Sequence, residues 1–176
     1  MKPPLAIIAT MAASTVWGQP QQFEELGRRA LDAARAGRYP EAVGAYEQML
    51  KIDPIAKVRA VAAKADLRLV GIGQMDQRAQ VHIDGFVSRG ELFDMMRLGA
   101  VGELTGWAFD AKGRIIDGGT NQRLTSIPPQ VPAKALTIGA AVGPAKVPAI
   151  AAALKGRLIN GLVTDETTAS AILKQQ

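Results

Sequence analysis

The sequence predicts an α/β protein in which a parallel sheet is preceded by an α-helical hairpin. From about residue 65 onward, short apolar segments that suit buried strands alternate with helical patterns, which is typical of a parallel sheet. Before residue 65 the apolar residues follow helical spacing. The 176 residues are 48% apolar and 21% charged, enough apolar material for a packed core and enough length for two domains at most.

Residues 22–64 are predicted to form a helical hairpin and one more helix. Gly37 interrupts the helical pattern, and Pro40 suits the first turn of the helix that follows. Residues 23–54 resemble a single tetratricopeptide repeat at Leu26, Ala30, Gly37, Tyr39, Ala42, Tyr46 and Pro54. One repeat cannot bury its own apolar face. We therefore expect a hairpin that packs against a neighbouring domain rather than a peptide-binding solenoid.

Residues 1–18 contain an apolar run from Leu5 to Trp17 behind a single lysine. The run is too short for a stable membrane span but has the length of a signal-peptide core. Two interpretations stay open, a signal peptide or an apolar leader. The first predicts export or a periplasmic location, and the second predicts a cytoplasmic protein.

The elements of residues 65–176 are expected in alternating order. Ser88 and Glu91 have the spacing of a capping box, which predicts that a helix starts there. A turn is expected at residues 110–113. Strands are expected at residues 67–73, 103–109, 114–116, 135–141 and 158–163, and helices at 88–98, 149–154 and 166–173.

Four motifs in this region resemble the second half of the sugar-binding domain of SorC-family transcriptional regulators. They are ADLRLVGIG (65–73), GAVGE (99–103) with FD (109–110) and Gly113, GPAK (143–146) and LVTDETTA (162–169). Each motif is weak alone, but four in this order are fairly specific. The resemblance covers residues 65–174 and implies a partial, Rossmann-like fold of the sugar-phosphate isomerase and CoA-transferase type. It also implies a phosphorylated sugar as ligand and a possible homo-oligomer.

Five residues are candidate ligand contacts: Gly71, Gly73, Glu103, Gly143 and Lys146. The three glycines are expected after strands, at the carboxyl edge of the sheet, where backbone N–H groups can approach an anion. Lys146 is expected at or just before a helix start, where its ammonium could hold a phosphate. Glu103 could accept hydrogen bonds from sugar hydroxyls. The resemblance implies the lysine and the acidic residue as ligand contacts, while turn and capping roles are the ordinary alternatives.

The charge of the chain gives no reason to expect nucleic-acid contact. Residues 1–65 carry 9 Lys/Arg against 6 Asp/Glu, and residues 66–176 carry 12 against 10, so the net charge of +5 is spread thinly. The sequence has neither a basic run nor a recognition-helix pattern. Without cysteine, and with His82 as the one histidine, the usual metal-ligand sets are absent, and we expect no metal and no cofactor.

The sequence therefore favours a carbohydrate-binding effector domain of the transcriptional-regulator type, without its own helix-turn-helix, and not an enzyme. Two alternatives remain. One is an exported tetratricopeptide-like interaction module with a degenerate C-terminal domain. The other is a sugar-phosphate isomerase-like enzyme in which Lys146 and Glu103 would transfer protons. His82 is the one conventional acid–base group, and its ordinary interpretation is a surface or turn histidine.

Overall fold

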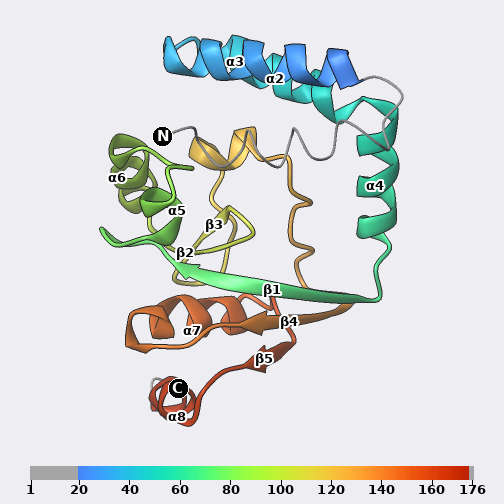
Figure 1. The fold of residues 1–176 in the computed structure, drawn as a ribbon. Helices are drawn as coiled ribbons and strands as arrows, with labels where there is room; N and C mark the ends of the chain where they lie inside the picture. Colours follow the sequence, from blue (N-terminus) through green and yellow to red (C-terminus); the bar gives the residue numbers. More distant parts are fainter. Residues whose placement is uncertain (1–19, 175–176) are drawn as a thin grey trace. The chain divides into compact units, whose positions relative to one another are not determined.

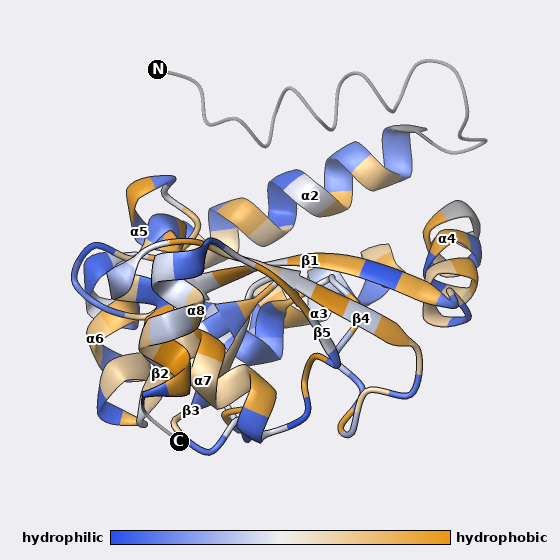
Figure 2. Ribbon diagram, turned by 90° about the horizontal axis from the view of Figure 1, so that it is seen from below, coloured by the Kyte–Doolittle hydropathy of each residue, from blue (hydrophilic) through white to orange (hydrophobic). Residues whose placement is uncertain are grey.

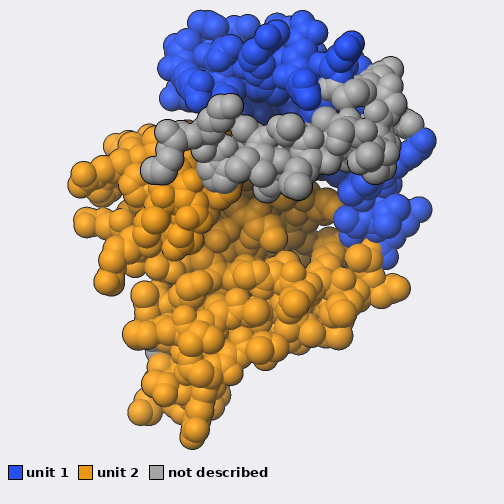
Figure 3. Space-filling model, viewed as in Figure 1, with its two compact units in different colours: residues 1–64 blue, residues 65–176 orange. Residues whose placement is uncertain are grey.

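The computed structural model describes residues 20–174, which belong to two compact units, residues 1–64 and residues 65–176 (Figures 1 and 3). The predicted signal peptide or apolar leader at residues 1–18 lies outside the described residues. No helix in the described part is both long enough and apolar enough to cross a membrane.

In the first unit, residues 20–64 form three helices, α2 (Pro20–Arg35), α3 (Tyr39–Leu50) and α4 (Asp53–Ala63). The helices α2 and α3 form the predicted hairpin, and Gly37 turns the chain between them with a positive φ of 73°. Small buried side chains, including Ala30 and Ala45, let the two helices approach closely. The prediction of a hairpin before the sheet is confirmed, whereas its likeness to a tetratricopeptide repeat stays a prediction.

The second unit is built on a five-stranded sheet of order β3-β2-β1-β4-β5 (Figure 1). Its strands are β1 (Leu67–Gln74), β2 (Ala100–Leu104), β3 (Trp107–Asp110), β4 (Leu136–Ala140) and β5 (Gly161–Val163). Its helices are α5 (Gln80–Ile83), α6 (Arg89–Arg97), α7 (Val147–Lys155) and α8 (Glu166–Leu173), with 3-10 turns η1 (Gly119–Arg123) and η2 (Pro144–Lys146). The predicted α/β class is confirmed.

The sheet is mixed rather than wholly parallel. The strands β1, β4 and β5 are parallel, whereas β2 and β3 form an antiparallel hairpin beside β1. The prediction of one extended segment over residues 103–109 is therefore wrong, because the chain reverses at Thr105 and Gly106. Both loop residues have positive φ, 51° and 94°, as in the type I′ turns that close two-residue hairpins. The strand predicted at residues 114–116 is a single bridge between Ile115 and Phe109.

The capping box predicts the start of α6 correctly. The Glu91 N–H donates to Ser88 Oγ at 3.3 Å, and the Ser88 N–H donates to Glu91 Oε2 at 2.8 Å. Burial removes water from the Glu91 carboxyl and raises its pKa, but the hydrogen bonds from Ser88 and the charge of Arg123 outweigh it, and the net pKa is lowered. The box therefore stabilises the first turn with an ionised carboxylate.

Alternation along β1 separates two unlike faces of the sheet. Ile72 points into the core, where it packs with Phe109 and with Ile150 of α7. On the other face Leu67 and Leu69 are 56% and 70% exposed and pair with Leu136 and Ile138 of β4. Figure 2 shows hydrophobic stretches along both strands. Parallel sheets are usually covered on both faces. Within residues 65–174 the apolar core forms two clusters, one around α7 with Ile72 and Ile150, and one around α6 with Leu92 and Met95.

Asn121 in η1 closes the outer edge of the β2–β3 hairpin. Its Oδ1 accepts the Ala108 N–H at 2.8 Å, and its Nδ2 donates to the carbonyls of Ala108 at 3.0 Å and Ile116 at 2.8 Å. The side chain is 4% exposed. It therefore pairs with β3 much as another strand would, and it satisfies backbone groups that are buried there.

Replacing Asn121 by alanine should lower the free energy of unfolding by about 2 to 4 kcal/mol, because three hydrogen bonds are lost and buried backbone groups are left unpaired. Denaturant titration measures the change. The neighbouring Gln122 is less buried and makes no such set of bonds, and its change to alanine should stay within about 0.5 kcal/mol of the parent protein. Equal stability of the two variants would contradict this account of Asn121.

Candidate functional site

Lys146 lies at the carboxyl edge of the parallel strands. The segment that follows β4 turns at Gly143, with φ 110°, and continues through η2 into α7, which begins at Val147. Lys146 is the N-cap residue of α7, and its Nζ donates to the carbonyl of Ile72 on β1 at 2.9 Å. Neighbouring parallel strands end at the same edge of a sheet. Lys146 thus lies just before a helix start, as the sequence predicts, and the loop after β4 brings its ammonium close to the carboxyl end of β1.

The start of α8 holds this loop in place. The Gly143 N–H donates to Thr168 Oγ1 at 2.9 Å, and this hydroxyl donates in turn to Asp165 Oδ2 at 3.0 Å. Asp165 is the N-cap of α8 and accepts the Thr168 N–H at 2.7 Å, the contact that most strongly lowers its pKa. The Gly143 N–H is thus occupied within the protein, and Gly143 contributes a left-handed turn rather than a free donor.

Glu103 approaches the end of β1 from the opposite side. It lies on β2 directly across from Gly73, and its Oε2 accepts the Gly106 N–H at 2.6 Å. Burial raises the pKa of the Glu103 carboxyl, and it outweighs the lowering by the N–H groups of Gly106 and Gly73 and by the positive charge of Lys146. The site therefore holds a carboxyl group that gains a proton more readily than an exposed glutamate does.

Gly71 and Gly73 differ in what surrounds them. Both lie inside β1, so the prediction that they form a loop after the strand is wrong; the strand continues to Gln74 because β2 pairs with its last residues. At Gly73 an added Cβ would lie 2.9 Å from Glu103 Cδ, whereas at Gly71 it would meet nothing within 4 Å. Gly73 therefore makes room for the carboxyl group, whereas the space beside Gly71 is open.

The structure thus brings Gly73, Glu103, Gly143 and Lys146 to one edge of the sheet, with Gly71 two residues earlier on β1. Lys146 uses one of its three N–H groups on β1. An ammonium beside a carboxyl group can bind an anion on one side and hydroxyl groups on the other. The lone histidine takes no part, because His82 Nδ1 is hydrogen-bonded to the Val87 carbonyl at 2.9 Å, in the turn after α5.

The sequence interpretation missed the residues that support the site. Thr105 and Gly106 form the turn that delivers an N–H to Glu103, and Thr168 ties down Gly143. Two-residue hairpin turns are usually Asn-Gly, Asp-Gly or Gly-Gly, so Thr105-Gly106 carries only the glycine of that signal. The Thr168 contact joins positions 25 residues apart, and no local pattern reports it.

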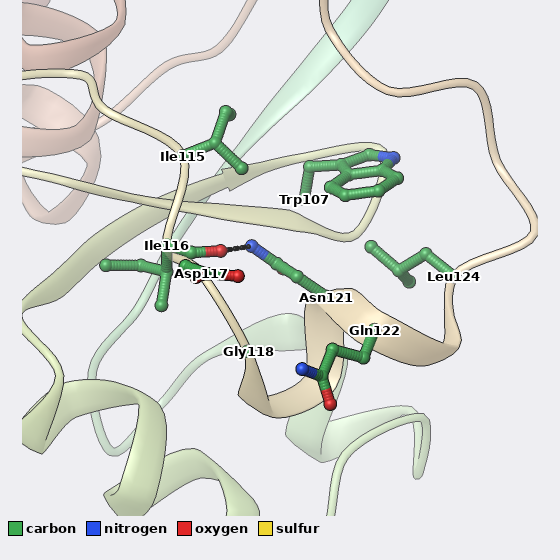
Figure 4. A pocket seen from close by; sticks show the side chains of 8 residues that line it. All are labelled: Trp107, Ile115, Ile116, Asp117, Gly118, Asn121, Gln122 and Leu124. Atoms are coloured by element: carbon green, nitrogen blue, oxygen red, sulfur yellow. Dashed lines mark hydrogen bonds between the residues drawn. The ribbon is translucent and has the colours of Figure 1, made fainter. Parts of the chain in front are cut away.

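Two open cavities lie elsewhere in the second unit. One, of about 420 Å³, is bordered by Trp107, Ile115, Ile116, Asp117, Gly118, Asn121, Gln122 and Leu124 (Figure 4). Its central amide, Asn121, already bonds to the backbone, as Figure 4 shows for the Ile116 carbonyl. The other, of about 480 Å³, lies between the turn after β3 and the end of α7. None of the five candidate residues borders either cavity.

The family model described as "Putative sugar-binding domain" matches residues 41–174. The chain belongs to the sugar-binding domain family. The match begins inside α3, so this family's domain takes in helices that precede the sheet. The resemblance to SorC-family regulators is thereby confirmed.

The relatives of this sugar-binding domain are transcriptional regulators. The chain is 46% identical over 125 residues to the transcriptional regulator LsrR of Enterobacter sp. (strain 638), a match that covers 67% of the chain and 39% of the regulator. It is 33% identical over 129 residues to the erythritol catabolism regulatory protein EryD of Brucella abortus (strain 2308), covering 73% of the chain and 41% of that protein. The chain thus spans about two fifths of the length of these curated relatives.

Solved structures carry the same domain. The full-length sorbitol operon regulator SorC from Klebsiella pneumoniae superposes with a TM-score of 0.64 at 26% identity, over 73% of this chain and 42% of that one. The sugar-binding domain of a transcriptional repressor from Vibrio fischeri superposes with a TM-score of 0.65 at 24% identity, over 76% and 54%. The second likeness shows the fold alone. This chain therefore carries a sugar-binding domain of the kind found in transcriptional regulators.

The two glycines of β1 provide a matched test of the site. Gly73→Ala should destabilise the protein by about 1 to 3 kcal/mol, because the new methyl group overlaps the Glu103 carboxyl group. Gly71→Ala should change the stability by less than about 0.5 kcal/mol. Removing the carboxyl group in the double variant Gly73→Ala/Glu103→Ala should recover part of the loss, measured as a non-additive change in denaturant titrations. Equal effects of the two glycine substitutions would contradict the proposed contact.

Proposed function

We propose that the edge of the sheet at the end of β1 binds a phosphorylated sugar. The observation that carries the proposal is that Lys146 and Glu103 reach adjacent residues of β1 from opposite sides, Lys146 at Ile72 and Glu103 at Gly73. The two remaining N–H groups of the Lys146 ammonium suit phosphate oxygens, and the Glu103 carboxylate suits sugar hydroxyls. Gly73 leaves space for the Glu103 carboxyl group, and Gly143 makes the turn that precedes Lys146.

We further propose that the chain is the effector domain of a transcriptional regulator. Binding of the sugar to this domain would change how copies of the regulator associate into homo-oligomers. The support is the family and the regulators that share the domain. In this proposal no residue is catalytic, and Lys146 and Glu103 bind rather than transfer protons. A sensor of phosphorylated sugars belongs where those metabolites are made, which favours the cytoplasm over the exported alternative.

Isothermal titration calorimetry with a panel of pentose and hexose phosphates tests the binding site. Lys146→Ala should weaken binding of the best ligand by about 10- to 100-fold, the range expected when charge-assisted hydrogen bonds are lost. Lys174→Ala, at the exposed end of α8, is the matched control and should bind as the parent does. Because Lys146 also contacts β1, thermal melts must show that the variant is folded. Equal affinity in a folded Lys146→Ala protein would overturn the proposal.

The pH dependence of binding should reveal Glu103. Its folded-state pKa lies above the ordinary 4.5, so on acidification it loses its negative charge at a higher pH than an exposed glutamate. Sugar affinity should therefore fall as the pH drops through this raised pKa. The raised pKa has the opposite consequence for the stability of the fold. Above that pKa the buried ionised carboxylate costs free energy, so the contribution of Glu103 to stability improves as the pH falls and the carboxyl is protonated.

Glu103→Gln separates this effect from titration of the ligand, whose phosphate changes charge near about pH 6. The phosphate contribution should be the same in both proteins, whereas the additional loss of affinity at low pH should be present only with Glu103. Calorimetric titrations of both proteins across the acid range measure the difference. Superimposable pH profiles would show that Glu103 does not contact the sugar.

A further inference from the structure

Four basic side chains border one open cavity on the opposite end of α7 from Lys146. Lys112 and Arg114 belong to the turn after β3, and Lys155 and Arg157 belong to the end of α7. The cavity has a volume of about 480 Å³, within the usual range for small-ligand pockets. We call it the basic cavity; Gly113, Ile115, Val131, Pro132 and Gly156 complete its lining.

The two turns that carry these cations are locked together through their backbones. A Cβ added to Gly113 would lie 2.5 Å from the Cα of Gly156, and one added to Gly156 would lie 2.5 Å from the Cα of Gly113. Only glycine on both sides allows so close an approach. The contact fixes Lys112 and Arg114 relative to Lys155 and Arg157, although the two pairs lie far apart in sequence.

The cavity carries an unbalanced positive charge. Asp110 accepts hydrogen bonds from Arg114 Nε at 2.8 Å and from the N–H groups of Lys112 and Arg114, so it orients one guanidinium. For Lys112, Lys155 and Arg157 the structure records no ion pair within the described residues. Four cations less one carboxylate leave a charge of +3. Clusters of this kind attract anions and raise their local concentration.

Arg157 adds backbone strain at the same place. Its φ is 55°, in the left-handed region where glycine is the usual residue just after a helix. Its N–H donates to the Leu154 carbonyl at 3.0 Å, and its carbonyl accepts the Ala133 N–H at 2.8 Å. The backbone is thus held from both sides, and the position that would suit glycine carries a guanidinium that borders the cavity. Strained positions of this kind are concentrated at binding sites.

We propose that the basic cavity binds a small anion with two or more negative charges, of the diphosphate class. A single carboxylate would leave two of the three excess charges uncompensated, whereas a diphosphate group matches them. The cavity shares no residue with the Lys146 and Glu103 site, so it is a second anion site and does not depend on the proposed sugar function. Its cations are exposed, so binding weakens as salt screens them.

Calorimetric titration of the chain with inorganic pyrophosphate, at about 50 mM ionic strength, tests the proposal. The variant Lys112→Gln/Lys155→Gln/Arg157→Gly removes three cations while it keeps the polar surface and supplies the glycine that the left-handed position favours. Its affinity for pyrophosphate should fall by at least about tenfold, as expected when several close charge pairs are lost. Lys174→Gln is the matched control and should bind pyrophosphate as the parent does.

Two comparisons distinguish a specific site from binding at the sugar site and from general attraction of anions. Lys146→Ala should retain pyrophosphate binding within about twofold, because the sugar site is distinct; a comparable loss in that variant would assign the binding to the sugar site and overturn the proposal. Sulfate at equal ionic strength should bind more weakly than pyrophosphate. Equal binding of the two anions, or unchanged affinity in a triple variant with a normal thermal melt, would show an unspecific counterion atmosphere instead of a site.

Discussion

The candidate site depends on a change of hydrogen-bonding partner along β1. Residues Leu67–Gly71 pair with β4 on one side, and residues Ile72–Gln74 pair with β2 on the other. The parallel pairing brings the loop after β4, with Lys146, to the end of β1. The antiparallel pairing places Glu103 across from Gly73. One strand therefore positions both charged groups, and each group contacts β1 itself, Lys146 at a carbonyl and Glu103 against a glycine.

The electrostatics of the site reflect a balance between burial and hydrogen bonding. Glu103 receives two backbone N–H groups and lies near an ammonium, an environment that usually favours a charged carboxylate. Its pKa is nevertheless raised, which means that removal from water is the larger effect. Asp165 shows the reverse, because the hydrogen bond from the Thr168 N–H outweighs its desolvation and lowers its pKa. Glu103 thus gains a proton more readily than an exposed glutamate does, whereas Asp165 is a structural anion that caps α8.

The sequence predicts those helices and strands whose signals lie within a few neighbouring residues. The capping box predicted the start of α6, and the alternation of apolar segments predicted the α/β class. The sequence predicts one extended segment over residues 103–109, whereas the chain reverses at Thr105 in a backbone conformation that β-branched residues rarely adopt. A threonine there is a poor turn signal, so the sequence concealed the hairpin.

The site was only partly predictable for a related reason. Lys146 and Glu103 are the last residues of the GPAK and GAVGE motifs, and their candidacy rests on the family resemblance. Gly71 and Gly73 could not be told apart, since their difference lies in the cross-strand neighbour and not in the flanking sequence. The hydrogen bond from Gly143 to Thr168 and the contact of Gly113 with Gly156 join distant segments. Such contacts follow from the packing of α7 and α8, which no window of sequence contains.

Strained backbone positions indicate candidate functional sites without reference to sequence motifs. Among the described residues, the two non-glycine positions with positive φ are Thr105 and Arg157. Thr105 belongs to the turn that delivers an N–H to Glu103, and Arg157 borders the basic cavity. Glycine would relieve the strain at either position, and it would also remove the Arg157 guanidinium. Where a sequence departs from its local preference, the departure needs a compensating interaction. At Arg157 the backbone hydrogen bonds with Leu154 and Ala133 hold the left-handed turn, and the guanidinium that stands in place of a glycine borders the basic cavity.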